Sequence, residues 1–209
     1  FLSRKTGRGF YDYVDENNNP KVDTLITDSC PLEITVCGEP GIEQSIVQLL
    51  KDNQIEYQTK ENDSFKFIVN EVHIALTDGR TATERSAKEN IMDFVLFDLA
   101  LDFTNSNRCA ITASAQASAK AATTAIAFFN AIGKSVSVLN DVPGMLVMRT
   151  VCMLANEGAD AVNQQVCNEQ AVDTAMEYGV NYPLGPLAWA ERIGLENVIN
   201  VLRNLAQTY

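Results

Sequence analysis

The pattern of apolar and polar positions between residues 31 and 140 alternates between strand-like and helix-like runs. The run LEITVCG, residues 32–38, indicates a buried strand. The run IEQSIVQLLKDN after it is amphipathic, and its apolar face consists of Ile42, Ile46, Leu49 and Leu50. Further runs are strand-like in FKFIV, VHIALTD, CAITAS and KSVSVLN, apolar in MDFVLFDLAL, and helical in SAKAATTAIAFFNAIG, which ends at Gly133. This alternation predicts an α/β fold with a parallel sheet and helices packed on it.

Residues 141–209 change to a purely helical period. The first predicted helix runs from about Pro143 to Val162, because proline suits the first turn of a helix and an apolar stripe follows. The stripe consists of Met145, Met148, Cys152, Ala155, Ala159 and Val162. Asn168 is a candidate N-cap for a second helix that ends at Gly179, and LAWAERIG and LENVINVLRNLAQTY indicate two more. Four short helices predict a compact helical domain.

Residues 1–30 show neither the alternation of a strand nor the period of a helix. The segment DENNNPKVD is rich in turn-forming residues, and the opening FLSRKTGRGFYDY starts at Phe1 and has the character of an end rather than a beginning. We therefore expect a fragment of a longer protein, divided into a tail and linker over 1–30, a sheet domain over 31–140 and a helical domain over 141–209.

Charge narrows the possible partners. The 209 residues include 16 Lys and Arg against 27 Asp and Glu, a formal net charge of −11. An acidic surface repels phosphate backbones, which argues against nucleic acid as a partner. No apolar run approaches the ~20 residues that span a bilayer, so no membrane partner is expected. The local basic cluster of Arg4, Lys5 and Arg8 indicates a solvated loop.

The cysteines indicate a reducing compartment. They are Cys30, Cys37, Cys109, Cys152 and Cys167. Their number is odd, and no pair has the C-x-x-C spacing of a zinc or redox site. Cys37 falls in a strand-like run and Cys152 on the helical stripe, where an unpaired thiol behaves as a small hydrophobe. We expect reduced, buried thiols in a cytoplasmic protein.

The strand, turn and helix over residues 34–50 have the arrangement of a nucleotide-binding unit but not its fingerprint. Dinucleotide binding needs G-x-G-x-x-G, so that the backbone approaches the pyrophosphate closely. Here only Gly38 and Gly41 are present, with Glu39 and Pro40 between them. A carboxylate in the turn opposes a phosphate, so this segment is interpreted as a structural turn.

No residue outside the turn forms a clear catalytic or metal site. His73 is the only histidine and lies in a strand-like run, whereas a general base needs a partner that orients it. One histidine without paired cysteines argues against a metal site, and G-x-S-x-G is absent. We therefore predict no catalytic residue and no metal ligand in this chain.

Arg149 is the one charged residue that stands among apolar neighbours of the first predicted helix. An arginine near a packed face needs a partner. Glu157 lies two turns further along, with Asp160 near it. Two interpretations remain open: a structural ion pair, or a contact with an anionic ligand or a second subunit.

The stretches DVPGMLVMR, ANEGADA, DTAMEYGVNYPLGP and RIGLENV together resemble the 3-hydroxyacyl-CoA dehydrogenase family. DVPGMLVMR, residues 141–149, is similar to the family's D-T-P-G-F-I-V-N-R, and ANEGADA is similar to its N/M-E-A element. DTAMEYGVNYPLGP, residues 173–186, follows the family pattern D-x-A-x-x-x-G-x-x-Y-P-x-G-P, and RIGLENV resembles the segment after it. The matched positions are Asp141, Pro143, Gly144, Val147, Arg149, Asp173, Ala175, Gly179, Tyr182, Pro183, Gly185 and Pro186.

The opening RKTGRGFYDY resembles the tail that ends the helical domain of the same family. The resemblance therefore implies that residues 1–30 close a preceding helical domain, that 31–140 form a reduced Rossmann-like domain and that 141–209 form a second helical domain. Longer bacterial members have this order. They are associated with oxidation of 3-hydroxybutyryl-CoA and 3-hydroxyadipyl-CoA, in fatty acid metabolism and phenylacetate degradation.

The departures from the family concern its chemistry. The family's catalytic histidine and glutamate are not found here, and its active-site asparagine on the first helix corresponds to Met148. A thioether cannot donate the hydrogen bond that an amide can. The resemblance thus implies a second copy without catalytic residues, which packs against the preceding NAD-binding and helical domains as subunits of shorter relatives pack in a dimer.

The resemblance implies that the chain is the C-terminal part of an NAD-dependent 3-hydroxyacyl-CoA dehydrogenase. This part is expected to be inactive alone and to serve domain packing or dimerisation. NAD and acyl-CoA are expected in the parent enzyme, and no cofactor on this chain. Arg149, Met148 and Glu157 are the candidate substrate-binding or interface residues. One alternative is a non-catalytic module that binds acyl-CoA or serves assembly, and the other is an independent NAD-binding enzyme built on residues 31–140. A homodimer is expected.

Overall fold

A computed structural model gives the fold over most of the chain. The residues that it describes are 6–7, 9, 11–15, 19, 24–25, 31–62, 64–100 and 102–208. The basic cluster of Arg4, Lys5 and Arg8, and with it Cys30, lies outside the described residues, as does most of the predicted tail.

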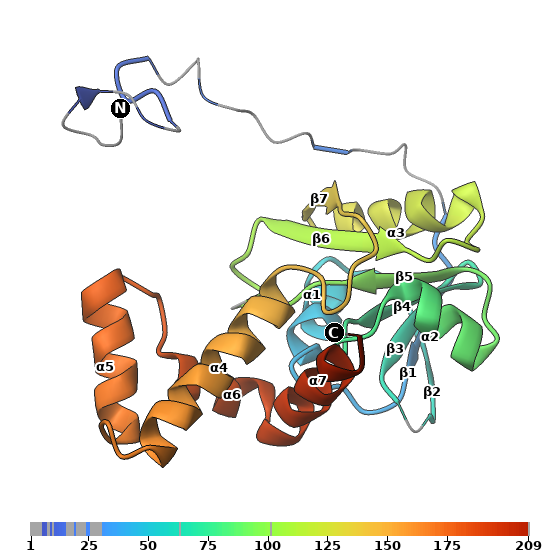
Figure 1. Cartoon of the computed structure of the whole chain (residues 1–209). Helices are drawn as coiled ribbons and strands as arrows, with labels where there is room; N and C mark the ends of the chain where they lie inside the picture. Colours follow the sequence, from blue (N-terminus) through green and yellow to red (C-terminus); the bar gives the residue numbers. More distant parts are fainter. Residues whose placement is uncertain are drawn as a thin grey trace.

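Within the described part, seven strands form one sheet in the order β2-β1-β3-β4-β5-β6-β7 (Figure 1). Their bounds are β1 Ile34–Cys37, β2 Gln58–Lys60, β3 Lys66–Val69, β4 Val72–Leu76, β5 Phe94–Phe97, β6 Arg108–Ala113 and β7 Ser135–Val138. Three pairs are parallel, β1 with β2, β4 with β5 and β6 with β7. Each of these pairs is joined by a helix, α1 Gln44–Asp52, α2 Ala82–Glu89 or α3 Ala119–Ala131.

The three parallel units meet through antiparallel pairs, β1 with β3, β3 with β4, and β5 with β6. The turn between β3 and β4 consists of Asn70 and Glu71, both with positive φ, and so short a connection can join only antiparallel strands. The predicted class, a reduced Rossmann-like sheet followed by a helical domain, is confirmed. The sheet is mixed rather than wholly parallel, because these connections are too short for crossovers.

The two faces of the sheet carry different helices. On one face α1 and α3 enclose a core in which Phe67, Phe97 and Phe128 lie in contact. On the other face α2 covers Phe94 and Leu96. The alternation of Phe94, Leu96 and Phe97 between the faces follows from the period of two in a strand. Both α2 and β2 were absent from the sequence prediction.

Four helices of the described residues follow the sheet, as predicted. They are α4 Val147–Asn163, α5 Glu169–Val180, α6 Pro186–Ile193 and α7 Leu195–Thr208. The prediction for the first was wrong at its start, since α4 begins after Gly144 and Met145, whose φ angles of 68° and 52° are left-handed. Met145 therefore does not join the α4 stripe but packs with Phe94 and Leu96 beneath α2.

Candidate functional site

A cleft of about 380 Å³ separates the sheet from the helical domain. The strands β1, β4 and β5 run in the same direction, and the segments after β1 and β4 form one wall of the cleft. The other wall comes from α4, α6 and α7, through Met148, Ile193, Asn197, Asn200 and Val201. Ligands of open α/β sheets bind outside the carboxyl ends of the strands, so this cleft is the candidate site.

Carboxylates dominate the sheet wall of the cleft. Glu39 and Glu43 follow β1, and Asp78 follows β4. Glu43 is only 8 % exposed, and burial raises the pKa of its carboxyl, although the backbone N–H groups of Glu43 and Gly41 act in the opposite direction. A buried carboxyl of this kind makes the cleft unfavourable for another anion.

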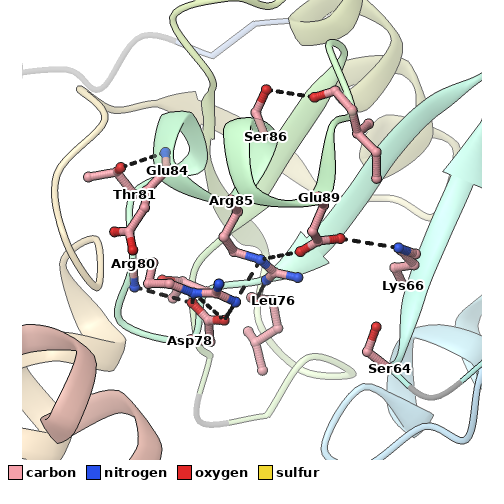
Figure 2. Close-up of polar contacts among 12 residues, drawn as sticks. Ser64, Lys66, Leu76, Asp78, Arg80, Thr81, Glu84, Arg85, Ser86 and Glu89 are labelled. Atoms are coloured by element: carbon pink, nitrogen blue, oxygen red, sulfur yellow. Dashed lines mark hydrogen bonds and ion pairs between the residues drawn. The ribbon is translucent and has the colours of Figure 1, made fainter.

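The cationic groups at the cleft, Arg85 in its lining and Arg80 and Lys66 beside it, are neutralised within the chain (Figure 2). Arg80 forms an ion pair with Asp78, and Arg85 lies 3.7 Å from Asp78 and 3.1 Å from Glu89. Glu89 also accepts a hydrogen bond from Lys66 at 3.3 Å. Burial raises the pKa of Asp78 and of Glu89, but the surrounding cations outweigh burial and hold both pKa values below the usual range. These cations therefore stabilise the junction of β3, β4 and α2.

The turn after β1 does not fit a dinucleotide. Gly38 has a φ of 76°, and a Cβ atom there would lie 2.9 Å from the carbonyl oxygen of Ser64 and 3.0 Å from that of Asn62. The side of Gly38 on which a side chain would lie is thus occupied by the backbone of the chain itself. The N–H of Gly38 is also engaged, since it donates to Lys60 O at 2.9 Å. A pocket of about 620 Å³ is lined by Gly38, Glu39 and Pro40 together with Lys51 and Lys60, so what argues against a phosphate at this turn is the charge of Glu39 and Glu43 and the absence of the further glycines, not a lack of space.

Met148 lies at the helical wall of the cleft and in the core behind it. It is 2 % exposed and packs with Val151, Cys152 and Leu205. Its Sδ atom lies 3.8 Å from Cys152 Sγ. The position that the family resemblance assigns to an asparagine is therefore an apolar lining of the cleft, with no side-chain donor.

Asp98 fixes α4 to the sheet. It follows β5, and its carboxylate accepts hydrogen bonds from the N–H groups of Leu146, Val147 and Met148 at 2.9, 2.7 and 2.9 Å. These donors are the unsatisfied N–H groups of a helix start, where a carboxylate is most favourable. Asp98 was not predicted from the sequence, although a carboxylate in the middle of the apolar run MDFVLFDLAL was the available signal.

Two aspartates of the family-like motifs have the same structural role. Asp141 accepts hydrogen bonds from the N–H groups of Ala82 and Thr83, at 2.7 and 2.9 Å, at the start of α2. Asp173 accepts from Leu187 and Ala188, at 2.9 and 3.0 Å, at the start of α6. These motif positions therefore hold helices in place, and their presence does not require catalysis.

Arg149 and Glu157 lie away from the cleft. Arg149 lines a groove of about 610 Å³ between α4 and α7, and Glu157 is exposed on α4. Among the residues that the structure describes, no ion pair joins Arg149 to Glu157 or to Asp160. The structure thus places Met148 at the cleft and the other two candidates on the outer side of α4.

His73 also lies away from the cleft. It stands near the start of β4, whereas the cleft is at the other end of this strand. Burial lowers the pKa of its imidazole, and Lys66 acts in the same direction. Its ring stacks on Phe94 with 6.3 Å between centroids. His73 thus has the surroundings of a structural strand residue.

The other candidates for chemistry can be placed within the described residues. Cys37, Cys109 and Cys152 are buried and Cys167 is half-buried, and none of these four forms a disulfide. Burial raises the pKa of the Cys152 thiol to about 12, which keeps it protonated. The described part of the chain contains no cluster of three potential metal-ligating side chains. It also contains no helix long and apolar enough to cross a membrane.

Two family models match the chain in succession. The model described as the 3-hydroxybutyryl-CoA dehydrogenase reduced Rossmann-fold domain matches residues 74–143. The model described as 3-hydroxyacyl-CoA dehydrogenase, C-terminal domain, matches residues 144–209. The boundary between the two matches falls in the turn before α4, where the sheet ends and the helices begin.

Similar proteins are named for the same chemistry. The 3-hydroxyadipyl-CoA dehydrogenase of Escherichia coli strain K12 is 47 % identical over 85 residues, which cover 41 % of this chain and 18 % of that protein. A probable 3-hydroxybutyryl-CoA dehydrogenase of Bacillus subtilis is 35 % identical over 74 residues, 35 % of this chain and 26 % of that protein. The crystal structure of 3-hydroxybutyryl-CoA dehydrogenase from Escherichia coli K12 matches with a TM-score of 0.72 and 29 % identity, over 99 % of this chain and 38 % of that chain. The chain thus spans well under half the length of each of these relatives.

Proposed function

The chain belongs to the 3-hydroxyacyl-CoA dehydrogenase family, and from this we propose that it is the C-terminal region of an NAD-dependent enzyme that oxidises 3-hydroxyacyl-CoA to 3-oxoacyl-CoA. In this proposal residues 34–208 do not catalyse the reaction themselves. They form a reduced sheet and a helical domain that pack against the NAD-binding and helical domains of the same enzyme.

The observation that carries the proposal is the set of side chains that line the cleft. Met148 lines it with a buried thioether, which cannot donate a hydrogen bond to a substrate oxygen. The opposite wall carries Glu39, Glu43 and Asp78, with Arg85 beside Asp78, and the turn at Gly38 lacks the further glycines of a dinucleotide site. These features support a copy of the fold that keeps its architecture without a cofactor site.

The names of the relatives support the substrate class. They act, by name, on 3-hydroxyadipyl-CoA and 3-hydroxybutyryl-CoA, so the parent enzyme is proposed to use a CoA thioester of this kind, with NAD, in fatty acid metabolism or phenylacetate degradation. A cytoplasmic location is proposed on the same basis, together with the reduced state of the buried Cys37, Cys109 and Cys152.

The test is a turnover assay on this chain with acetoacetyl-CoA and NADH, followed by the absorbance of NADH. We expect no rate above the background without protein, whereas an intact dehydrogenase of the family gives turnover under the same conditions. The variant Met148→Asn is expected to remain inactive, because the amide alone supplies neither a base nor a cofactor site. A rate that scales with the concentration of this chain would contradict the proposal.

A second function, holding acyl-CoA without catalysis, is favoured by one observation. The groove between α4 and α7 is largely apolar, with Arg149 and Arg203 among its lining residues, and CoA combines phosphates with an acyl chain. Calorimetry with butyryl-CoA distinguishes the two functions. A saturable heat that Arg203→Ala reduces supports acyl-CoA binding, and the absence of heat supports the packing role.

A further inference from the structure

The two edge strands of the sheet differ in how they are protected. At one edge, β2 consists of Gln58, Thr59 and Lys60, all exposed, and polar residues with a lysine oppose pairing with a further strand. At the other edge, β7 has the uncharged sequence SVSV (Figure 1). Its last residue, Val138, is 47 % exposed. An uncharged edge strand rich in valine is prone to pair with another strand.

The backbone of β7 also presents hydrogen-bonding groups at this edge. The N–H groups of Ser135 and Leu139 donate, at 2.9 and 2.8 Å, to carbonyl groups of β6 and of the residue before it. The N–H and C=O groups of successive residues point to opposite sides of a strand, so those of Val136 and Val138 point away from β6. These groups can form hydrogen bonds with any extended segment that reaches the edge.

A segment of the linker lies on this edge. Leu25 forms an antiparallel bridge with Val136, and its N–H donates to Val136 O at 3.4 Å. The C=O of Leu25 accepts a hydrogen bond from Asn130 Nδ2, on α3, at 3.4 Å. The hydroxyl of Thr24 accepts another from Arg108 Nη2, on β6, at 2.9 Å. Three elements of the sheet domain, α3, β6 and β7, thus hold these two linker residues.

We propose that Thr24 and Leu25 form a strap that occupies the β7 edge and keeps other strands from pairing with it. A strand of another molecule would have to displace the three hydrogen bonds first. The strap belongs to the same chain, so its effective concentration at the edge is about millimolar, which favours it over a second copy in dilute solution. The strap supplies at β7 the protection that exposed polar residues supply at β2, and it is independent of the proposed function.

Hydrogen exchange of the Leu25 amide in the whole chain tests the contact. This amide is expected to exchange at least about tenfold more slowly than in an unstructured peptide, because it donates to Val136 O. Asn130→Asp replaces the donor by an oxygen that repels the C=O of Leu25, and is expected to remove the protection. Asn156→Asp, at an exposed position of α4, makes the same change in charge and is expected to keep it. Exchange at the peptide rate in wild type, or protection that survives Asn130→Asp, overturns the strap.

Release of the strap is expected to expose β7 to other copies of the chain. Leu25→Pro lacks the N–H that donates to β7, and sedimentation is expected to show larger species than wild type at the same protein concentration. Adding Val138→Lys places a charge on the open edge and is expected to restore the wild-type size. Thr59→Lys, at an exposed position of the other edge, is the matched control and is expected not to restore it.

A Leu25→Pro variant with the size distribution of wild type overturns the protective role, as does an equal rescue by Val138→Lys and Thr59→Lys. If Leu25→Pro loses the circular dichroism of the fold, Asn130→Asp takes its place in the same sedimentation series, with the same expected rescue. These measurements do not involve turnover, so their failure leaves the proposed function to its own assay.

Discussion

At the scale of single residues, Gly185 and Asp173 explain one family-like motif without reference to catalysis. A Cβ atom on Gly185 would lie 2.2 Å from Asp173 Cγ, while the carboxylate of Asp173 accepts two N–H groups at the start of α6. Glycine is required because the carboxylate approaches the backbone so closely. The aspartate and the glycine of this motif are thus explained by a close contact between α5 and the start of α6.

This contact predicts opposite effects for two glycines of the helical domain. Gly185→Ala is expected to lower the free energy of unfolding by about 1–3 kcal/mol, since it displaces Asp173. Gly179→Ala is the control: a Cβ atom there meets nothing within 4 Å, and alanine is expected to stabilise α5 by up to about 0.5–1 kcal/mol. Urea unfolding measures both. Equal effects of the two substitutions would show that the contact is not what requires glycine.

At the scale of elements, the helices and strands with a strong apolar period were predictable, and the polar ones were not. The segment ATERSAKE of α2 buries Ala82, Arg85 and Ser86, so its inner face carries few apolar residues to detect. All three residues of β2 are exposed, which is possible because it is the edge strand. Their structure depends on partners that are distant in sequence, which a local pattern does not contain.

Asp98, which fixes the start of α4, could not be predicted for the same reason, since its partners are distant in sequence. Asp98 accepts hydrogen bonds from three N–H groups about fifty residues further along the chain, so only the folded structure reveals the pairing. Arg149 was identified from its apolar neighbours, Glu157 as a partner for it, and Met148 from the family resemblance, but the sequence could not decide which of them faces the cleft. The structure places Met148 there, Arg149 at the groove between α4 and α7 and Glu157 at an exposed position of α4.

Asp98 gives a prediction at this scale. Asp98→Ala removes three charge-assisted hydrogen bonds in a buried position, and is expected to lower the free energy of unfolding by about 2–4 kcal/mol. Asp52→Ala, at the exposed end of α1, is expected to change it by about 0.5 kcal/mol or less. If the two variants had the same urea midpoint, Asp98 would not stabilise the junction of β5 and α4.

At the scale of the whole molecule, the cleft between the sheet and the helices contains a carboxyl that opposes folding at neutral pH. Burial raises the pKa of Glu43 above its value of 4.5 in a model compound. The folded protein therefore holds this proton more tightly than the unfolded chain does. Stability from Glu43 is fully present below the unfolded pKa and is lost as the pH rises through the folded pKa.

Glu43→Gln tests this sign. The variant is expected to be more stable than wild type at pH 7, and the difference is expected to vanish near pH 4, where the carboxyl is protonated in both states. Urea unfolding at the two pH values measures the difference. Glu39→Gln, at an exposed position in the same turn, serves as the control and is expected to change little. A difference that grows toward low pH would contradict the account of Glu43.

The central claim is that this chain keeps the architecture of its family while its own cleft does not accept the cofactor. Titration of the chain with NADH, followed by NADH fluorescence, tests this claim most directly, because it requires neither a substrate nor another domain. We expect no saturable change up to about 1 mM NADH. Saturable binding at about micromolar concentration, weakened by substitution of Gly38 or Gly41, would contradict the claim.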